Sequence, residues 1–219
     1  MGSAGVLAFD LDGTLVDSLA GIHASLVHAC TQMGLAPPAL AALRARIGPP
    51  LRQYLPDLLS LEAESQQAML EPLLQAFRNH HDSQGWRAFS LYDGVASLLQ
   101  QLQVAGYGLH VVTQKPHAVA VAVLRQAGLD SYLTTVDGPR GGASFDKTSS
   151  LLRLRQPNHR CYWYVGDTTG DRQAAAAAGY RFVAATYGYG FRDGWGVGVG
   201  VDAAIDVPLD LLQVLEAAV

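Results

Sequence analysis

Apolar residues recur along this chain in two patterns, short continuous runs and longer series with helical spacing. The first run, residues 5–9, leads directly into Asp-Leu-Asp-Gly-Thr and predicts a buried strand followed by a polar loop. Between residues 18 and about 84 the spacing is helical over 20–33, 39–47 and 65–80, with glycines and prolines between these segments. This stretch predicts a small all-helical unit.

After residue 92, strand and helix patterns alternate. Strands are expected at 108–112, 132–136, 160–165 and 181–185, and helices at 95–105, 116–127, 147–154, 171–178 and 209–218. Pro116 favours the first turn of its helix, and Gly128 and Gly179 favour helix ends. Alternation of this kind predicts an α/β fold, a parallel sheet with helices on both faces.

The order of these elements predicts two domains. The first strand stands apart from the others, so residues 1–16 and 86–219 are expected to form the α/β core and residues 17–85 a helical insertion. The length of 219 residues fits a core with a smaller insert. The glycine-rich stretch 187–200 is expected to be a loop that carries no site.

Composition narrows the class of protein. Apolar residues make up 49% of the chain and the net charge is −4, which is a globular composition without the basic balance of a nucleic-acid binder. No apolar run approaches the ~20 residues of a membrane span, and residues 1–5 lack the pattern of a secretory signal. Two cysteines predict reduced thiols and a cytoplasmic protein. The sequence does not indicate an oligomeric state.

Charged and polar residues gather where the predicted strands end, the edge at which open parallel sheets bind ligands. They are Asp10, Asp12, Thr113, Asp167 and Asp171, with Lys147 at the start of a helix on the same side. Four carboxylates and one ammonium give a formal charge of −4 + 1 = −3, which a dianionic phosphate would take to −5. Such a cluster requires a cation, and ligands that are all oxygen favour Mg²⁺.

The Asp-x-Asp pair predicts covalent chemistry. Alternate residues of an extended segment project in similar directions, so Asp10 and Asp12 can flank one substrate. One carboxylate can attack phosphorus while the other transfers protons. Each motif alone is compatible with a structural role, for example a turn and a helix N-cap at Asp167 and Asp171. Their order and their placement at strand ends favour a site.

Four segments closely resemble the motifs of the haloacid dehalogenase superfamily. They are residues 9–18 (Phe-Asp-Leu-Asp-Gly-Thr-Leu-Val-Asp-Ser), residues 111–115, Lys147 and residues 165–171. The helical insertion is similar to the mobile cap of the phosphoglycolate-phosphatase-like branch. The resemblance spans nearly the whole chain. It implies a Rossmann-like core, a helical cap, and a Mg²⁺-dependent phosphatase that forms an aspartyl-phosphate.

The resemblance also implies roles for residues. Asp10 would attack phosphorus, and Asp12 would protonate the leaving group and then activate water. Mg²⁺ would be held by the Asp10 carboxylate, the backbone carbonyl of Asp12, and Asp167. The phosphoryl oxygens would be held by Thr113, the backbone at Gln114, and Lys147, with Asp171 orienting Lys147 or a metal-bound water. Position 114 is glutamine where this branch usually has asparagine, so the resemblance carries over only the backbone contribution at this position.

Related activities are separated by single residues. Dehalogenases lack the second aspartate, so Asp12 argues against that activity. Phosphonoacetaldehyde hydrolases need a lysine in the cap, whereas the two lysines of this chain are Lys115 and Lys147. A β-phosphoglucomutase typically has an aliphatic residue in place of Thr14. That mutase, and a non-catalytic binding module that retains the fold, are the alternatives to a phosphatase.

The substrate is expected to be a small phosphate ester, with phosphoglycolate the first candidate. Residues 48–52 resemble the cap loop that approaches the site in phosphoglycolate phosphatases, so Gly48 and Arg52 are assigned to substrate binding. Only two of the fifteen basic residues are lysines, which suggests that Lys147 occupies a position where arginine fails. Lys115 is expected to lie further from the metal and to tolerate replacement better.

Overall fold

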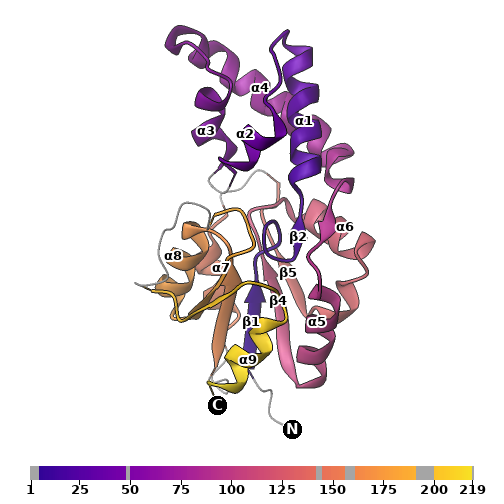
Figure 1. The fold of residues 1–219 in the computed structure, drawn as a ribbon, viewed down its shortest axis with the longest axis vertical. Coiled ribbons are helices and arrows are strands. Elements are labelled where there is room, and N and C mark those ends of the chain that lie inside the picture. Colours follow the sequence, from indigo (N-terminus) through magenta and orange to yellow (C-terminus); the bar gives the residue numbers. More distant parts are fainter. Residues whose placement is uncertain (1–4, 48–49, 142–144, 156–160, 191–199, 219) are drawn as a thin grey trace. The chain divides into compact units, whose positions relative to one another are not determined.

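The computed structural model describes residues 5–47, 50–141, 145–155, 161–190 and 200–218, with only the backbone described at 63–67. The chain divides into two compact units (Figure 1). The core unit comprises residues 1–17 and 91–219, and the helical unit comprises residues 18–90.

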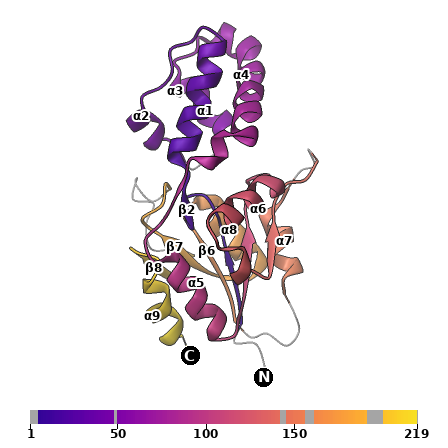
Figure 2. The same cartoon turned by 90° about the vertical axis from the view of Figure 1, so that its right-hand side faces the viewer.

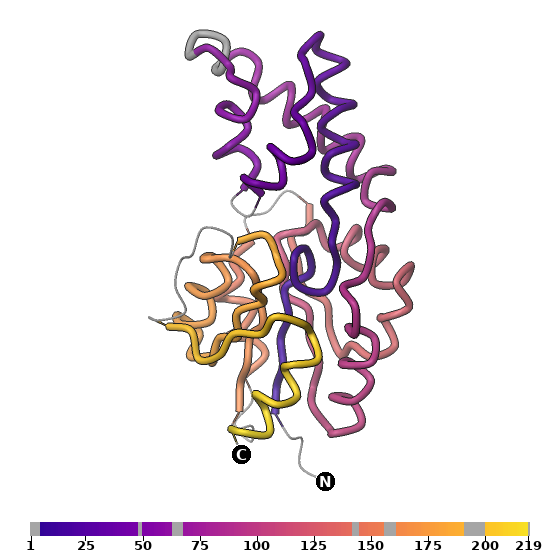
Figure 3. The backbone as a smooth tube through the Cα atoms, in the orientation of Figure 1, coloured from indigo at the N-terminus to yellow at the C-terminus, as the bar shows by residue number. Residues whose placement is uncertain are grey.

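The core unit is built on a six-stranded sheet in the order β5-β4-β1-β6-β7-β8. The strands are β1 (Gly5–Phe9), β4 (Tyr107–Val112), β5 (Thr135–Asp137), β6 (Tyr162–Gly166), β7 (Arg181–Ala185) and β8 (Ala203–Ile205). All five pairings between neighbours are parallel. The first strand lies inside the sheet, between β4 and β6, and is buried along its whole length (Figure 3). The predicted α/β fold class is therefore confirmed.

Helices cover both faces of this sheet. They are α5 (Val95–Val104), α6 (His117–Gln126), α7 (Lys147–Arg153), α8 (Thr169–Ala178) and α9 (Asp210–Glu216). Figure 1 shows α5 and α6 on one side of the strands and α7 and α8 on the other. Alternate residues of the strands, among them Val6, Ala8, Tyr162 and Tyr164, form one buried cluster with Leu151 of α7 and with alanines of α8. This alternation is the expected consequence of the two-residue repeat of a strand.

Several elements of the structure differ from the sequence prediction. The strand expected at 132–136 is wrong at its start, because residues Asp130–Tyr132 form a 3₁₀ turn, η2, and β5 begins only at Thr135. The amide of Tyr132 donates to the carbonyl of Leu129 instead of joining the sheet. Two short strands, β2 (Val16–Asp17) and β3 (Ser90–Leu91), pair with each other and were not predicted. Strand β8, which follows the glycine-rich stretch, was also missed.

The helical unit contains α1 (Leu19–Gln32), α2 (Leu40–Arg44), α3 (Leu51–Leu58), α4 (Ala63–Ser83) and a 3₁₀ turn, η1 (Gly85–Arg87). Helices α1 and α4 lie side by side (Figure 2). Leu26 and Ala29 of α1 and Leu73 of α4 are fully buried. Helix α3 was not predicted, because it has Pro50 at its N-cap and Pro56 inside it. None of the described helices is both long and apolar enough to span a bilayer.

Candidate active site

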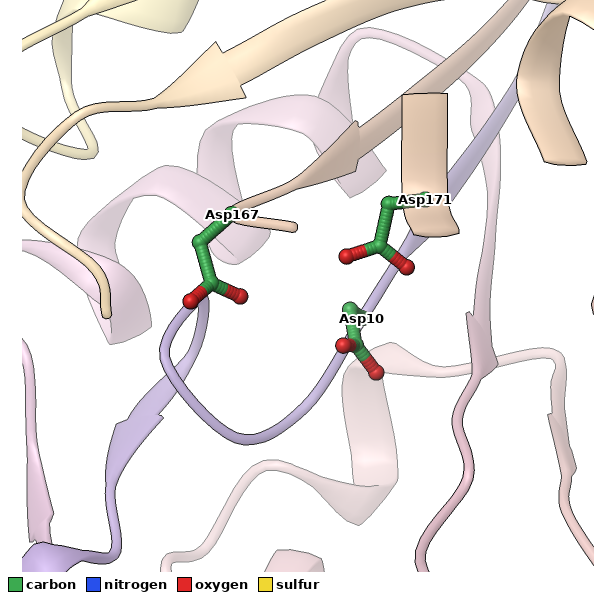
Figure 4. Close-up of side chains that lie close together, drawn as sticks. All are labelled: Asp10, Asp167 and Asp171. Carbon is green, nitrogen blue, oxygen red and sulfur yellow. The ribbon is translucent and has the colours of Figure 1, made fainter. Parts of the chain in front are cut away.

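Three buried aspartates meet at the carboxyl edge of the sheet. Asp10 follows β1, Asp167 follows β6, and Asp171 lies in the first turn of α8 (Figure 4). One carboxylate oxygen from each lies within 4.8 Å of the others. Because β1 and β6 are parallel neighbours, both strands end at the same edge of the sheet, and their following residues are brought together.

Asp10 is fixed by the backbone and by Lys147. Its amide donates to the carbonyl of Val165 on β6 at 2.9 Å, and its Oδ1 accepts from the amide of Leu11 at 2.8 Å. Its Oδ2 lies 3.0 Å from Nζ of Lys147. Both carboxylate oxygens therefore have a partner, and the side chain is held in one orientation.

Lys147 joins two of the aspartates. It is the first residue of α7, whose N-cap Asp146 accepts hydrogen bonds from the amides of Thr148 and Ser149. Its buried ammonium lies 2.6 Å from Oδ1 of Asp171 and 3.0 Å from Oδ2 of Asp10. Burial by itself would lower the pKa of Lys147, but the carboxylates of Asp10 and Asp171 outweigh burial and raise the pKa above its usual value. The ammonium therefore stays charged.

Both carboxylate oxygens of Asp171 accept hydrogen bonds. Thr168 and Asp171 form a capping box at the start of α8, in which Oδ2 of Asp171 accepts from the amide and the hydroxyl of Thr168 at 3.0 and 2.6 Å. The hydroxyl of Tyr164 lies 2.9 Å from Oδ1. The spacing Thr-x-x-Asp was a sequence signal for the Thr168 contact, whereas nothing in the sequence indicated Tyr164.

Asp167 is enclosed by a loop that the sequence analysis left without a role. The amide of Tyr189 donates to Oδ2 of Asp167 at 2.8 Å, and the Thr14 hydroxyl lies 3.3 Å from Oδ1. A Cβ at Gly188 would lie 2.3 Å from Cβ of Asp167, and a Cβ at Gly13, where φ is +83°, would lie 2.2 Å from Oδ2. Only glycine allows these approaches. The expectation that stretch 187–200 carries no part of the site is therefore wrong for its first residues.

Burial makes ionisation of this cluster unfavourable. It raises the pKa of Asp10 to about 6, an effect that Lys147 opposes and Asp171 reinforces. Burial and the charges of Asp171 and Asp10 hold the pKa of Asp167 well above its usual range. The negative charges of Asp10 and Asp167 are not fully balanced by neighbouring cations, and these side chains offer only oxygen atoms as ligands. Such a pair of carboxylates suits a hard divalent cation. Asp10, Asp167 and Asp171 are therefore side chains that could hold a metal ion.

Lys115 also belongs to this group of charges. Its Nζ lies 3.0 Å from Oδ1 and 3.2 Å from Oδ2 of Asp12, a contact that was not predicted from the sequence. Its side chain is only 5% exposed, whereas that of Asp12 is 24% exposed. Four aspartates and two lysines now give a formal charge of −4 + 2 = −2, instead of the −3 counted from the sequence. The cluster still carries an excess of negative charge.

The remaining predicted residues are placed as follows. Thr113 directly follows β4 and is buried, and its Oγ1 accepts from the amide of Lys115 at 3.2 Å. Gln114 is exposed. Arg52 belongs to α3 of the helical unit and pairs with Glu71 of α4, with both side chains more than half exposed. Gly48 lies outside the described residues.

The core unit is therefore a parallel α/β sheet with three buried aspartates and a lysine at its carboxyl edge, an arrangement that can hold a divalent cation. The family model for haloacid dehalogenase-like hydrolases matches residues 7–185. The chain belongs to this family.

Two curated relatives are similar over most of the chain. The tyrosine-protein kinase PtkA of Mycobacterium tuberculosis is 33% identical over 193 residues, which cover 86% of this chain and 64% of PtkA. This chain therefore spans less than two thirds of the length of that relative. A phosphoglycolate phosphatase of Rhodobacter capsulatus is 32% identical over 193 residues, which cover 85% of this chain and 86% of that protein.

Solved structures share the fold. The structure of M. tuberculosis PtkA has a TM-score of 0.78 at 30% identity and covers 98% of this chain and 99% of that chain. A haloacid dehalogenase-like hydrolase from Streptococcus pneumoniae has a TM-score of 0.83 at 24% identity and covers 96% of this chain and 97% of that chain.

Proposed function

We propose that this protein is a Mg²⁺-dependent phosphomonoester hydrolase that uses Asp10 as its nucleophile. The observation that carries the proposal is the buried contact of Lys147 with Asp10 and Asp171, next to Asp167. Lys147 holds the nucleophile in place and offers positive charge to an incoming phosphoryl group. When bound, Mg²⁺ would supply the further positive charge that a dianionic phosphate needs beside these carboxylates.

The chemistry divides into two displacements. In the first, an oxygen of Asp10 forms a bond to phosphorus while the ester P–O bond breaks, and Asp12 donates its proton to the departing oxygen. In the second, Asp12 takes a proton from water as that water attacks phosphorus, and the bond between phosphorus and Asp10 breaks. Inorganic phosphate leaves and the Asp10 carboxylate is regenerated. Thr113 and the backbone at Gln114 are proposed to hold phosphoryl oxygens.

A small phosphate ester is the proposed substrate, with phosphoglycolate the first candidate. The R. capsulatus relative carries that activity in its name and is matched over 86% of its length. Residues 17–85, the helical insertion, are proposed to act as a cap that excludes water during turnover. Gly48 and Arg52 are proposed to contact the substrate, and Arg52 would have to exchange its present partner, Glu71, to do so.

The relationship to PtkA raises a second reaction, transfer of a phosphoryl group to a protein tyrosine. The hydrolase is favoured because the phosphatase is matched over 86% of its length in sequence, whereas PtkA is matched over 64%. Incubation with a panel of small phosphate esters and Mg²⁺, followed by measurement of released phosphate, tests the proposal. Release from none of them, together with label transfer from ATP to tyrosine, would replace hydrolysis by the kinase reaction.

Replacement of Lys147 by arginine is expected to lower kcat by at least ~10-fold, about 1.4 kcal/mol of barrier. The planar guanidinium is broader than an ammonium and cannot occupy the buried space 2.6 Å from Asp171 and 3.0 Å from Asp10. Steady-state rates on the best ester from the panel provide the measurement. Arg153→Lys is the control, because Arg153 lies on the same helix with its side chain 62% exposed. Equal rates for the two variants would contradict the assigned role of Lys147.

A further inference from the structure

Tyr164 connects strand β6, which leads to Asp167, with the end of strand β4. It is fully buried, and its hydroxyl lies 2.8 Å from the carbonyl oxygen of Val112, the last residue of β4. Strand β1 lies between β4 and β6, so the side chain extends past one intervening strand. The register partner of Tyr164 on β1 is Ala8, which belongs to the same buried cluster and whose side chain is a single methyl group. A small residue at this position leaves room for the phenol to reach β4.

The same hydroxyl also contacts the carboxylate of Asp171. It lies 2.9 Å from Oδ1, and this oxygen also accepts from Nζ of Lys147 at 2.6 Å. Two donors therefore meet at one oxygen atom, and Lys147 in turn contacts Asp10. The phenol has a single proton and two acceptors, of which the carboxylate is the stronger because hydrogen bonds to ionised groups are stronger than those between neutral groups.

The carboxylate of Asp171 is held by anchors from two different elements. At Oδ2 the donors belong to Thr168, at the start of the same helix, α8. At Oδ1 the phenol of Tyr164 belongs to the sheet, and the sheet also holds the backbone of Asp10. Without the phenol, Asp171 would be oriented only by its own helix and by Lys147. The position of the ammonium relative to Asp10 would then be less narrowly defined.

We infer that Tyr164 is a positioning residue, whose hydroxyl sets the orientation of Asp171. Through Asp171 it keeps the ammonium of Lys147 aligned with the nucleophile Asp10. The inference rests on the proposed phosphatase function and deepens it. A displacement of about 1 Å in a reacting group can lower a rate by about 100-fold. Because Tyr164 acts through other residues and does not touch the substrate, its loss should lower kcat more than it raises KM.

The test replaces Tyr164 by phenylalanine, which keeps the ring and removes only the hydroxyl. On the best ester from the panel, kcat should fall by roughly 10-fold, while KM should change by less than about 3-fold. Tyr180→Phe is the matched control, because Tyr180 is a buried tyrosine of the same cluster whose hydroxyl donates to the carbonyl of Leu151 at 2.9 Å. Each variant loses one buried hydrogen bond, so both should lower the melting temperature, but only Tyr164→Phe should lower kcat.

A double-mutant cycle tests whether the effect of Tyr164 passes through Asp171. Asp171→Ala removes the acceptor of the phenol, so the further replacement Tyr164→Phe should lower kcat by less than about 3-fold in that background. Asp171→Asn decides the result if the alanine variant does not fold, because its neutral amide removes the charged acceptor and should also reduce the effect of Tyr164→Phe.

Three results on an active wild-type protein would overturn the inference. An unchanged kcat in Tyr164→Phe would mean that the hydroxyl does not position the site. An equal fall of kcat in Tyr180→Phe would mean that the loss reflects packing of the cluster, and an undiminished loss in the Asp171 variants would mean that Tyr164 does not act through Asp171. A wild-type protein that releases phosphate from no ester of the panel would instead contradict the proposed function, and the inference with it.

Discussion

Replacement of Asp10 by asparagine should lower turnover by about 1,000-fold or more while the fold survives. Asparagine has the shape of aspartate and can still accept the hydrogen bond from the amide of Leu11, but it lacks the charge that attacks phosphorus. It also removes a buried carboxylate whose pKa burial raises to about 6, so the free energy of unfolding should not fall. Initial rates with Mg²⁺ and thermal unfolding curves would measure both effects.

Asp130→Asn makes the same chemical change at an exposed position of the core unit, at the start of η2, and serves as the control. Its rate should stay within about 3-fold of the wild type, as expected for a surface substitution. The covalent mechanism would be excluded if Asp10→Asn kept more than a few per cent of the wild-type rate.

Removal of divalent metal should abolish activity, and Mg²⁺ should restore it. Asp10 and Asp167 are buried close together, and Lys147, which also pairs with Asp171, cannot alone balance their negative charges and those of a bound phosphate. Ca²⁺ should not replace Mg²⁺, because its longer bonds and looser geometry misalign the in-line attack. The measurement is phosphate release in EDTA, and after addition of each metal in excess. Undiminished turnover in EDTA would contradict the assignment of a metal to these carboxylates.

The metal-free protein should lose stability as the pH rises. Burial raises the folded-state pKa of Asp10 from 3.8 to about 6, so folding favours the protonated carboxyl. The stabilisation is therefore complete below the unfolded-state pKa and is lost as the pH rises through about 6. In EDTA, the melting temperature of the wild type relative to Asp10→Asn should fall between about pH 4 and pH 7, and Mg²⁺ should reverse this fall at about pH 7. A relative melting temperature independent of pH would contradict the raised pKa of Asp10.

Most of the architecture could be predicted from local patterns. The buried run before Asp10 and the alternation after residue 92 are short-range signals, and they led to a parallel sheet with the first strand separated from the rest by helices. The elements at the edges of the sheet were harder to predict. Tyr132 and Leu133 are as apolar as strand residues, yet Tyr132 belongs to a 3₁₀ turn. Strand β8 is too short for its alternation to be recognised.

The sequence by itself determined which residues could carry the chemistry, because each of them lies next to the predicted end or start of a strand or helix. They are Asp10, Asp12, Thr113, Lys147, Asp167 and Asp171. Only the tertiary structure decided their pairings. Lys115 contacts Asp12 across 103 positions of sequence, and Thr14 and Tyr189 approach Asp167 from loops after β1 and β7. Such contacts depend on the order of strands in the sheet and on the space that Gly13 and Gly188 leave, and no local periodicity encodes either.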